Sequence, residues 1–224
     1  MPPMGRFRIR PRSIIMKFFD IHTHNRDADK NCSISNRASY IAGRNISIGL
    51  HPWDIDGEWI KKLGEIEQAA TAGNVLAIGE CGFDKIKSPA DIKVQAEIFH
   101  RHALIAEKVS KPLIIHCVKG VDELIAAYRS INPKQPWIIH GFRGNSLQAG
   151  QLIRYGFHIS LGEHFNADTA KEIPAERLFI ESDESGKEIA FIYSSIASER
   201  GCSIEELDKI VTSNVIRTFC GISI

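Results

Sequence analysis

Several features that mark other classes of protein are missing from this sequence of 224 residues. No apolar run approaches the roughly 20 residues that cross a bilayer, and no apolar core of signal-peptide type follows the first residues. Neither a glycine-rich phosphate loop nor a Gly-x-Ser-x-Gly motif is present, which argues against the NTPases and serine hydrolases built on them. We therefore expect a cytoplasmic protein without a membrane partner.

Cysteine is too scarce and too scattered to form a disulfide framework. The five cysteines are odd in number and contain no Cys-x-x-Cys pair, which favours a reducing compartment. Cys81 and Cys117 each follow a candidate ligand, Glu80 and His116 respectively. We expect both to be small residues at strand ends that face away from any site, rather than ligands or nucleophiles.

Charge of one sign is also lacking, because the formal net charge is only +1. This balance hides an asymmetry, since residues 1–17 contain five basic and no acidic residues, and the rest of the chain holds 23 basic and 27 acidic ones. A mildly acidic body argues against broad, non-specific binding of duplex nucleic acid, which needs a large basic surface. A small phosphate-binding pocket is compatible with this charge distribution.

The basic segment at the start is predicted to be a disordered extension covering residues 1–15. The reason is that the sequence MKFFDIHTH, which begins at Met16, is typical of the start of a first barrel strand. A nucleic-acid-binding or targeting arm is the alternative for this segment. Residues 16–224 are then long enough for one barrel or one doubly wound domain.

Strand-like apolar runs alternate with helical patterns along the remaining chain. Strands are expected at about 16–22, 31–36, 46–50, 75–80, 113–117, 137–140, 157–161 and 178–182. Helices are expected at 58–72, 90–109, 121–130, 145–155, 167–172 and 187–198, with a C-terminal pair near 203–211 and 213–219. Solid apolar strands separated by helices indicate a parallel sheet.

We therefore predict an α/β fold, a (β/α)8 TIM-type barrel that is distorted and shortened between its first and third strands. Between His24 and the run ISIGL the chain is too short for two crossover helices around a strand. Either a bare loop reaches the second strand, or the barrel is incomplete there.

Six residues of metal-ligand type stand at the ends of the apolar runs FFDIHTH, VLAIGE, PLIIH, PWIIH and LFIESD. They are His22, His24, Glu80, His116, His140 and Asp183. Barrels of this kind build their active sites at the C-terminal ends of the strands, so these side chains are expected to converge. Four imidazoles and two carboxylates suit two divalent cations such as Mg, Mn or Zn.

The individual positions support specific roles. His22 and His24 are two residues apart on a strand, so both imidazoles point to the same face and can reach one ion. Glu80 can bridge two ions, because each carboxylate oxygen can bind one metal. Asp183 can bind an ion and also act as the general base that accepts the proton of the attacking water. For a single such residue, a structural role would be the simpler interpretation.

Further polar residues adjoin the predicted ligands. We expect His51, in GLHPWD, to contact a substrate phosphate or to support a ligand, and Arg143, in HGFRGN, to clamp an anion unless it is a solvated surface residue. Asp84 is expected to hydrogen-bond a ligand or a loop. Three other histidines are interpreted as packing or surface residues, namely His100, His102 and His158.

The motifs FFDIHTH, SIGLHPWD, AIGECGFD, QAEIF, KPLIIHC, IIHGFRG, GFHISLG, LFIESD and SNVIRTFCGI occur in this order from residue 16 onward. In this respect the sequence resembles the TatD family of metal-dependent hydrolases. The resemblance implies a distorted (β/α)8 barrel with two divalent ions. It places His22, His24, Glu80 and Asp183 around one ion, and Glu80, His116 and His140 around the other. It also implies a 3'-5' deoxyribonuclease that hydrolyses phosphodiesters with a two-metal-activated hydroxide.

The sequence departs from the family pattern in loops that face the substrate. The segment between His24 and His51 is short, residues 184–186 replace a proline-containing segment, and residues 117–119 replace the usual Ser-Arg sequence after the histidine. The expected substrate is single-stranded DNA or a small phosphate ester, and the expected state is a monomer. The alternatives are a small-molecule amide, ester or lactone hydrolase using the same metals, and a metal-binding protein without turnover.

Overall fold

The computed structural model describes residues 18–219. The predicted extension at 1–15 and the first residues of the expected first strand lie outside this range. Within it, all eight expected strands are present. They are β1 (Asp20–Thr23), β2 (Ser33–Arg37), β3 (Ile46–Ile48), β4 (Val75–Asp84), β5 (Leu113–Val118), β6 (Trp137–Ile139), β7 (His158–Leu161) and β8 (Leu178–Ile180).

The strands are all parallel and follow one another in chain order around the sheet. The helices are α1 (Trp59–Ala69), α2 (Ile92–Val109), α3 (Val121–Ile131), α4 (Ser146–Tyr155), α5 (Ala167–Glu172), α6 (Ile189–Arg200) and α7 (Ile204–Thr218). Two short 3-10 turns, η1 (Pro52–Asp54) and η2 (Ala175–Arg177), complete the set. The predicted TIM-type barrel is confirmed.

The expected pair of C-terminal helices is wrong, because residues 204–218 form the single helix α7. A capping box between Ser203 and Glu206 begins the helix. Leu207, Val211 and Val215 are then spaced four residues apart and are all buried, so one apolar stripe continues through the expected break. Thr212 and Ser213, at that point, are not residues that end a helix.

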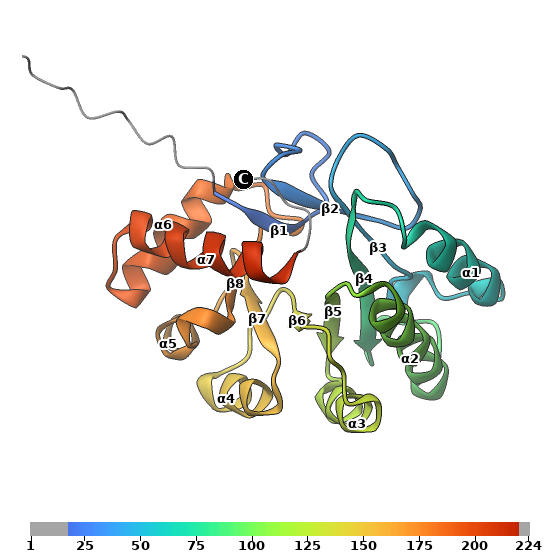
Figure 1. The fold of residues 1–224 in the computed structure, drawn as a ribbon. Coiled ribbons are helices and arrows are strands. Elements are labelled where there is room, and N and C mark those ends of the chain that lie inside the picture. Colours follow the sequence, from blue (N-terminus) through green and yellow to red (C-terminus); the bar gives the residue numbers. More distant parts are fainter. Residues whose placement is uncertain (1–17, 220–224) are drawn as a thin grey trace, which may run out of the picture.

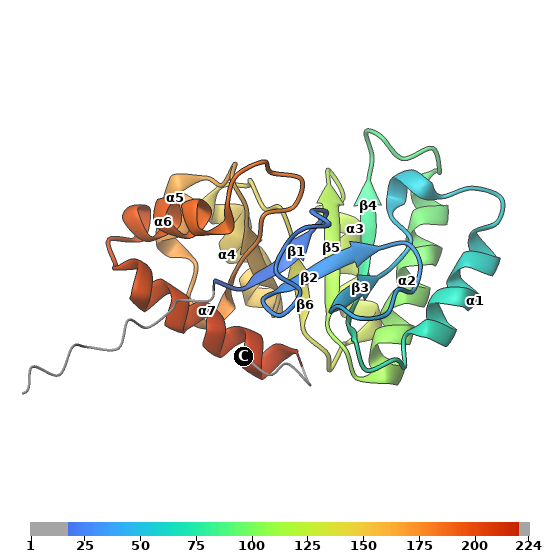
Figure 2. The same cartoon turned by 90° about the horizontal axis from the view of Figure 1, so that it is seen from above.

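The first third of the barrel is built without crossover helices. Loops at residues 24–32 and 38–45 lead to β2 and β3, and the first α-helix appears only after β3. Figure 1 shows the consequence, since loops rather than helices connect β1, β2 and β3. In Figure 2 β1 and β2 lie between the group α4–α7 and the pair α1 and α2. Of the two options that the sequence left open, the bare loop is the one observed.

The barrel closes through a minimal contact between its first and last strands. Thr23 and Asp183 form an isolated parallel bridge. The amide of Asp183 donates to the carbonyl oxygen of His22 at 2.9 Å, and the amide of His24 donates to the carbonyl oxygen of Asp183 at 3.0 Å. The barrel is therefore nearly closed, and its seam lies among the predicted ligands.

Apolar side chains fill the space between the strands and the helices. Trp137 of β6 packs edge to face against Phe99 of α2, with ring centroids 5.1 Å apart, and both are fully buried. Phe157, also buried, lies 5.9 Å from Trp137. Among residues 18–219, no helix is both long enough and apolar enough to span a membrane.

Strand β4 carries an irregularity that matters for the site. The register advances three residues on β4, from Ile78 to Cys81, while the partner strand β5 advances two, from Leu113 to Ile115. One extra residue in a strand is a β-bulge, and such bulges redirect side chains next to active sites. Glu80 lies inside this bulge.

Candidate metal centre

All six predicted ligands lie together at the C-terminal ends of the strands. Glu80 is at the centre, and three imidazoles approach it from β1, β5 and the end of β6. His24 and Asp183 complete the group at the seam of the barrel. Groups of ligand atoms within 4.8 Å of one another include His22, His24 and Asp183, and also His22, Glu80 and His140. The expected convergence of these residues is thus present.

The two oxygens of Glu80 face different sets of histidines. Oε2 lies 3.3 Å from Nε2 of His22 and 3.5 Å from Nε2 of His24. Oε1 lies 2.9 Å from Nδ1 of His116 and 2.8 Å from Nε2 of His140. A carboxylate placed in this way has one oxygen available for each of two neighbouring cations.

His22 provides a direct test of whether a cation fits. Its side chain is completely buried, yet neither ring nitrogen has a hydrogen-bond partner among the described residues. A buried polar atom without a partner costs free energy, so such atoms are rare in folded proteins. A metal ion bound at Nε2, beside Glu80 and Asp183, would satisfy that nitrogen. The donor set of imidazoles and carboxylates also suits Zn, Mn or Mg.

Asp183 reaches the centre from an uncommon backbone conformation. Its φ is +53°, in the left-handed region, which Asp tolerates better than most residues. Oδ1 lies 3.7 Å from His22 and 3.6 Å from His24, and more than a quarter of the side chain is exposed. Asp183 therefore stands between the buried ligands and solvent, where a substrate would enter.

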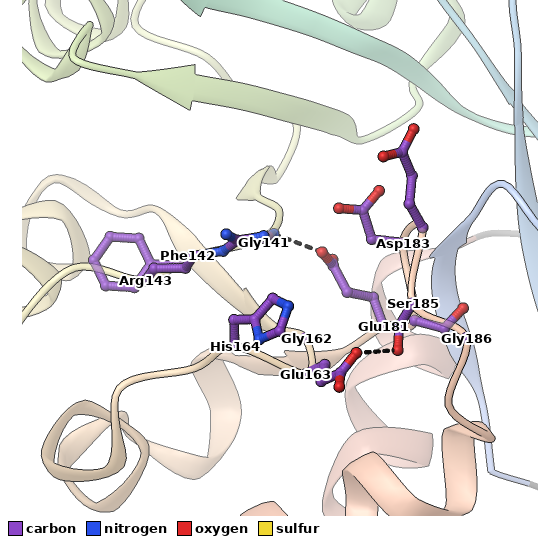
Figure 3. Close-up of a pocket in the computed structure, with 12 residues that line it drawn as sticks. Gly141, Phe142, Arg143, Gly162, Glu163, His164, Glu181, Asp183, Ser185 and Gly186 are labelled. Atoms are coloured by element: carbon purple, nitrogen blue, oxygen red, sulfur yellow. Dashed lines mark hydrogen bonds between the residues drawn. The ribbon is translucent and has the colours of Figure 1, made fainter.

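Sequence reasoning missed Glu181, which is fully buried two residues before Asp183. Its Oε1 lies 3.2 Å from Nδ1 of His140. The same oxygen accepts a hydrogen bond from the amide of Gly141 at 2.6 Å, which Figure 3 shows. A carboxylate at the far nitrogen of a histidine orients the ring toward a metal. A sequence signal was available, because Glu181 is an acidic residue at the end of the same apolar run, LFIESD, that contains Asp183.

Asn36, at the end of β2, was missed as well. Its amide nitrogen donates to Oε2 of Glu80 at 3.1 Å, and its Oδ1 accepts the amide hydrogen of Glu80 at 2.9 Å. These two bonds fix both the backbone and the side chain of the central carboxylate. No ligand-type residue marks this position, so only the tertiary structure reveals it.

His51 approaches Glu80 as closely as the predicted ligands do, with Nε2 3.0 Å from Oε1. Its Nδ1 accepts a hydrogen bond from the amide of Trp53 at 3.1 Å. A neutral ring that accepts at Nδ1 carries its proton on Nε2, which then serves as a donor rather than as a metal ligand. This geometry favours the expected contact to a carboxylate or phosphate oxygen.

Asp84 organises the loop beside the site, as expected. Its Oδ1 accepts hydrogen bonds from the amides of Ile86 and Lys87, and its Oδ2 accepts one from the indole nitrogen of Trp53 at 2.7 Å. The same Oδ2 lies 3.1 Å from Nε2 of His116. A carboxylate oxygen thus stands at each nitrogen of His116, Glu80 at one and Asp84 at the other.

The electrostatics of the cluster are strongly coupled. Burial of His140 opposes its charged form, but the Glu80 and Glu181 carboxylates outweigh burial and raise the pKa of His140 well above its usual value. For Glu80, burial is likewise outweighed, chiefly by His140 and His116, so its pKa lies well below the usual value. A hydrogen bond to Glu80 raises the pKa of His24. The carboxylates are therefore ionised and available to cations.

Two cavities open onto the cluster. The larger, of about 1020 Å³, runs from η1 past Glu80 and His116 to Arg143, which is exposed at its rim. The smaller, of about 310 Å³, lies on the β7–β8 side and contains Arg143, Glu163, His164 and Glu181 (Figure 3). There the hydroxyl of Ser185 donates to Glu163 at 2.5 Å.

The cysteines next to the ligands differ in their surroundings. Cys81 is fully buried and its thiol contacts the carbonyl oxygen of Ile114, away from the cluster. Cys117 is half-buried in the wall of the larger cavity, where burial raises the pKa of its thiol to about 11. Its thiol is therefore protonated at neutral pH and is a poor nucleophile.

Comparisons with known proteins agree with this picture. The family model described as TatD related DNase matches residues 11–220. The chain is 30% identical over 202 residues to the uncharacterized metal-dependent hydrolase YabD of Bacillus subtilis, which covers 77% of this chain and 76% of that protein. It is 27% identical over 214 residues to the 3'-5' ssDNA/RNA exonuclease TatD of Klebsiella pneumoniae, covering 84% and 81% of the two chains. The crystal structure of the TatD homologue YJJV from Escherichia coli has the same fold, with a TM-score of 0.77 at 18% identity over 92% of this chain and 99% of that one.

Proposed function

The chain belongs to the family of TatD-related DNases and is a metal-dependent hydrolase; from this and from the geometry of its site we propose that it hydrolyses phosphodiester bonds. The proposed substrate is single-stranded DNA, from which nucleotides are removed in the 3'-5' direction. The relative from Klebsiella pneumoniae that is named as a ssDNA/RNA exonuclease supports this choice.

The proposal depends on one observation: the two carboxylate oxygens of Glu80 face two different sets of histidines. His22, His24 and Asp183 would hold one divalent cation together with Oε2, and His116 and His140 would hold a second together with Oε1. When bound, such a pair of ions supplies a nucleophile from water at neutral pH and neutralises charge on the phosphate oxygens.

The chain's own residues supply the proton transfer and the positioning. Asp183, partly exposed at the mouth, accepts the proton of the attacking water through a carboxylate oxygen. Glu181 holds His140 through Nδ1, and Asn36 holds Glu80, so that neither side chain must reorganise during the reaction.

His51 and Arg143 are proposed to bind the phosphate. His51 lines the larger cavity with its Nε2 3.0 Å from Oε1 of Glu80, and Arg143 lines the same cavity. When a substrate is bound, an imidazole N–H and a guanidinium that line one cavity can donate to the non-bridging oxygens of a phosphate. Replacing either residue is expected to raise KM more than it lowers kcat, because both contacts form already in the bound substrate.

The test is hydrolysis of a 5'-labelled single-stranded DNA oligomer with added Mg or Mn, beside the Asp183→Asn protein. The proposal predicts stepwise loss of nucleotides from the 3' end by the wild-type protein alone. Cleavage of simple esters, amides or lactones, with oligonucleotides left intact, would contradict it and indicate a small-molecule hydrolase built on the same centre.

A further inference from the structure

One wall of the larger cavity displays an aromatic ring that the proposed chemistry does not use. Trp53, in η1, lines this cavity together with His51 and His116, and 40% of its surface is exposed. Of the three tryptophans, Trp137 is fully buried in the core and Trp59 lies outside both cavities. An indole this exposed, in a cavity that reaches the reactive centre, offers part of its apolar surface to a ligand.

The indole is held in a fixed position rather than left to move. Its nitrogen donates to Oδ2 of Asp84 at 2.7 Å. Asp84 is almost completely buried, and its other oxygen accepts hydrogen bonds from two backbone amides. On its other side the ring lies at 85° to the imidazole of His51, with centroids 4.7 Å apart. A rigid aromatic ring loses little entropy when a ligand packs on it.

A cation already rests on this ring. The ammonium of Lys87 lies 4.3 Å from the centroid of Trp53, in the geometry of a cation–π contact. Lys87 and Lys119 both line the cavity and have long, flexible side chains. A planar group that stacked on the indole would release the ammonium, which could then pair with a phosphate next to that group.

The ring is also close to the proposed reaction. Its centroid is 5.8 Å from that of His116, a proposed ligand of the second cation, and Asp84 contacts both side chains. A nucleotide whose phosphate lies at His51 and Glu80 would therefore place its base within reach of Trp53.

We propose that Trp53 is the stacking platform for a nucleobase that adjoins the scissile phosphate, with Lys87 moving to the neighbouring phosphate. This inference rests on the proposed function, since it assigns a base-binding subsite to the same cavity. Stacking on an aromatic side chain tolerates every base, because each has a π face, but it requires the base to be unpaired and unstacked. Trp53 would thus select single-stranded over duplex ends without reading sequence.

A purely structural role for Trp53, as the partner of Asp84, is separated from stacking by two variants. Trp53→Phe and Trp53→Leu both remove the indole nitrogen and so lose the bond to Asp84 equally. Only the phenylalanine variant retains an aromatic face. Phe191→Leu, which alters an exposed aromatic residue on α6 outside both cavities, is the matched control.

The first experiment measures kcat and KM for release of the 3' nucleotide from a single-stranded DNA oligomer. Stacking predicts a KM for Trp53→Leu about tenfold or more above that of Trp53→Phe. The same comparison uses oligomers with an abasic residue at one of the two positions that flank the scissile phosphate. At the stacked position the difference between the two variants should disappear, because no base is left to stack.

Binding gives a second readout that does not depend on turnover. In a Trp59→Phe background the remaining tryptophans are Trp53 and the buried Trp137, so quenching of indole fluorescence by a DNA trinucleotide reports on Trp53. Quenching is expected for the trinucleotide, and much less for one that is abasic at the stacked position.

The possible results distinguish the stacking subsite at Trp53 from the proposed nuclease activity. Equal KM values for the phenylalanine and leucine variants on intact DNA, or equal quenching by intact and abasic trinucleotides, would overturn the stacking subsite while leaving the nuclease in place. Failure of the wild-type protein to cleave or bind any DNA oligomer would overturn the proposed function and the subsite with it.

Discussion

The amide of Asp183 donates a hydrogen bond to the carbonyl oxygen of His22 at 2.9 Å, which joins the last strand end to the first. A second bond, from the amide of His24 to the carbonyl oxygen of Asp183, completes the connection. These two bonds form the seam of the nearly closed barrel and bring Asp183 beside two other proposed ligands, His22 and His24, which lie some 160 positions earlier in the chain. The seam of the barrel therefore lies within the proposed metal site.

Replacing Asp183 by asparagine should abolish most activity without unfolding the protein. Asparagine keeps the size and the tolerance for φ of +53°, but its amide cannot accept the proton of the attacking water. Loss of a general base typically costs about 10²–10⁴-fold in rate. The rate of nucleotide release and the thermal midpoint should be measured beside Asp168→Asn, an exposed change on α5. Near-normal activity in a folded Asp183→Asn protein would show that another group takes the proton.

Glu181→Gln should weaken metal binding, even though Glu181 is not among the proposed ligands. The variant replaces the carboxylate that orients His140 and accepts from Gly141 with a neutral amide. Changes of this kind behind a histidine ligand typically cost about 10–100-fold in metal affinity. Titration of the metal-free protein with Mn or Zn measures the effect. Glu163→Gln, in the same small cavity but hydrogen-bonded to Ser185, is the control and should bind normally.

Gly82→Ala should disturb both stability and metal binding. A Cβ atom at Gly82 would lie 1.9 Å from the carbonyl oxygen of His116, and φ there is +149°. Backbone cannot yield as a flexible side chain does, so we expect a loss of more than about 1 kcal/mol in the free energy of unfolding. His116 would be displaced with it. Gly57→Ala, at which a Cβ meets nothing within 4 Å, should be nearly neutral, and equal unfolding midpoints for the two variants would refute the prediction.

His102 should make the protein less stable as the pH falls from about 6.5 to about 4. Burial lowers its pKa from 6.5 to about 4, although its bond to Ile98 acts in the opposite direction. Above pH 6.5 the ring is neutral in both states. Below pH 6.5 the unfolded chain binds a proton at His102, whereas the folded protein binds one there only near pH 4. The free energy of unfolding therefore falls across this window, by up to about 3 kcal/mol.

The check is urea unfolding of metal-free protein at pH 7.5 and pH 5 for the wild type and for His102→Gln. The wild type should lose more stability between the two pH values than the variant does. His158, whose pKa burial also lowers to about 4, remains in both proteins and leaves a residual slope. Identical pH dependence in the two proteins would show that His102 is not the group responsible.

Most of this architecture could be predicted from the sequence, because parallel strands that are buried on both faces have continuous apolar sequences. Each run that ended in a ligand-type residue placed that residue at the same end of the barrel, so the grouping of His22, His116 and His140 around Glu80 followed from topology alone. The single helix α7 was mispredicted because its polar residues Thr212 and Ser213 interrupt the pattern in sequence, while the buried stripe runs past them in space.

The supporting residues were harder to predict, since their roles depend on three-dimensional contacts. Asn36 matters only because the short loops bring β2 beside the bulge of β4, a relationship that spans 44 positions. Glu181 shares the motif LFIESD with Asp183, and the motif alone does not show that the two carboxylates have different roles. His51 was recognised, but its orientation follows from the hydrogen bond to the amide of Trp53, which no spacing reveals.

If Glu80 bridges two cations, as proposed, the number of metal ions bound per chain depends on its carboxylate. Metal-free wild-type protein and Glu80→Gln should each be dialysed against Mn or Zn, and the metal bound per chain measured together with the rate of DNA hydrolysis. Two bound ions and activity are expected for the wild type, but one weakly held ion or none, and no hydrolysis, for Glu80→Gln. Two tightly bound ions with retained hydrolysis in Glu80→Gln would contradict the proposed bridge.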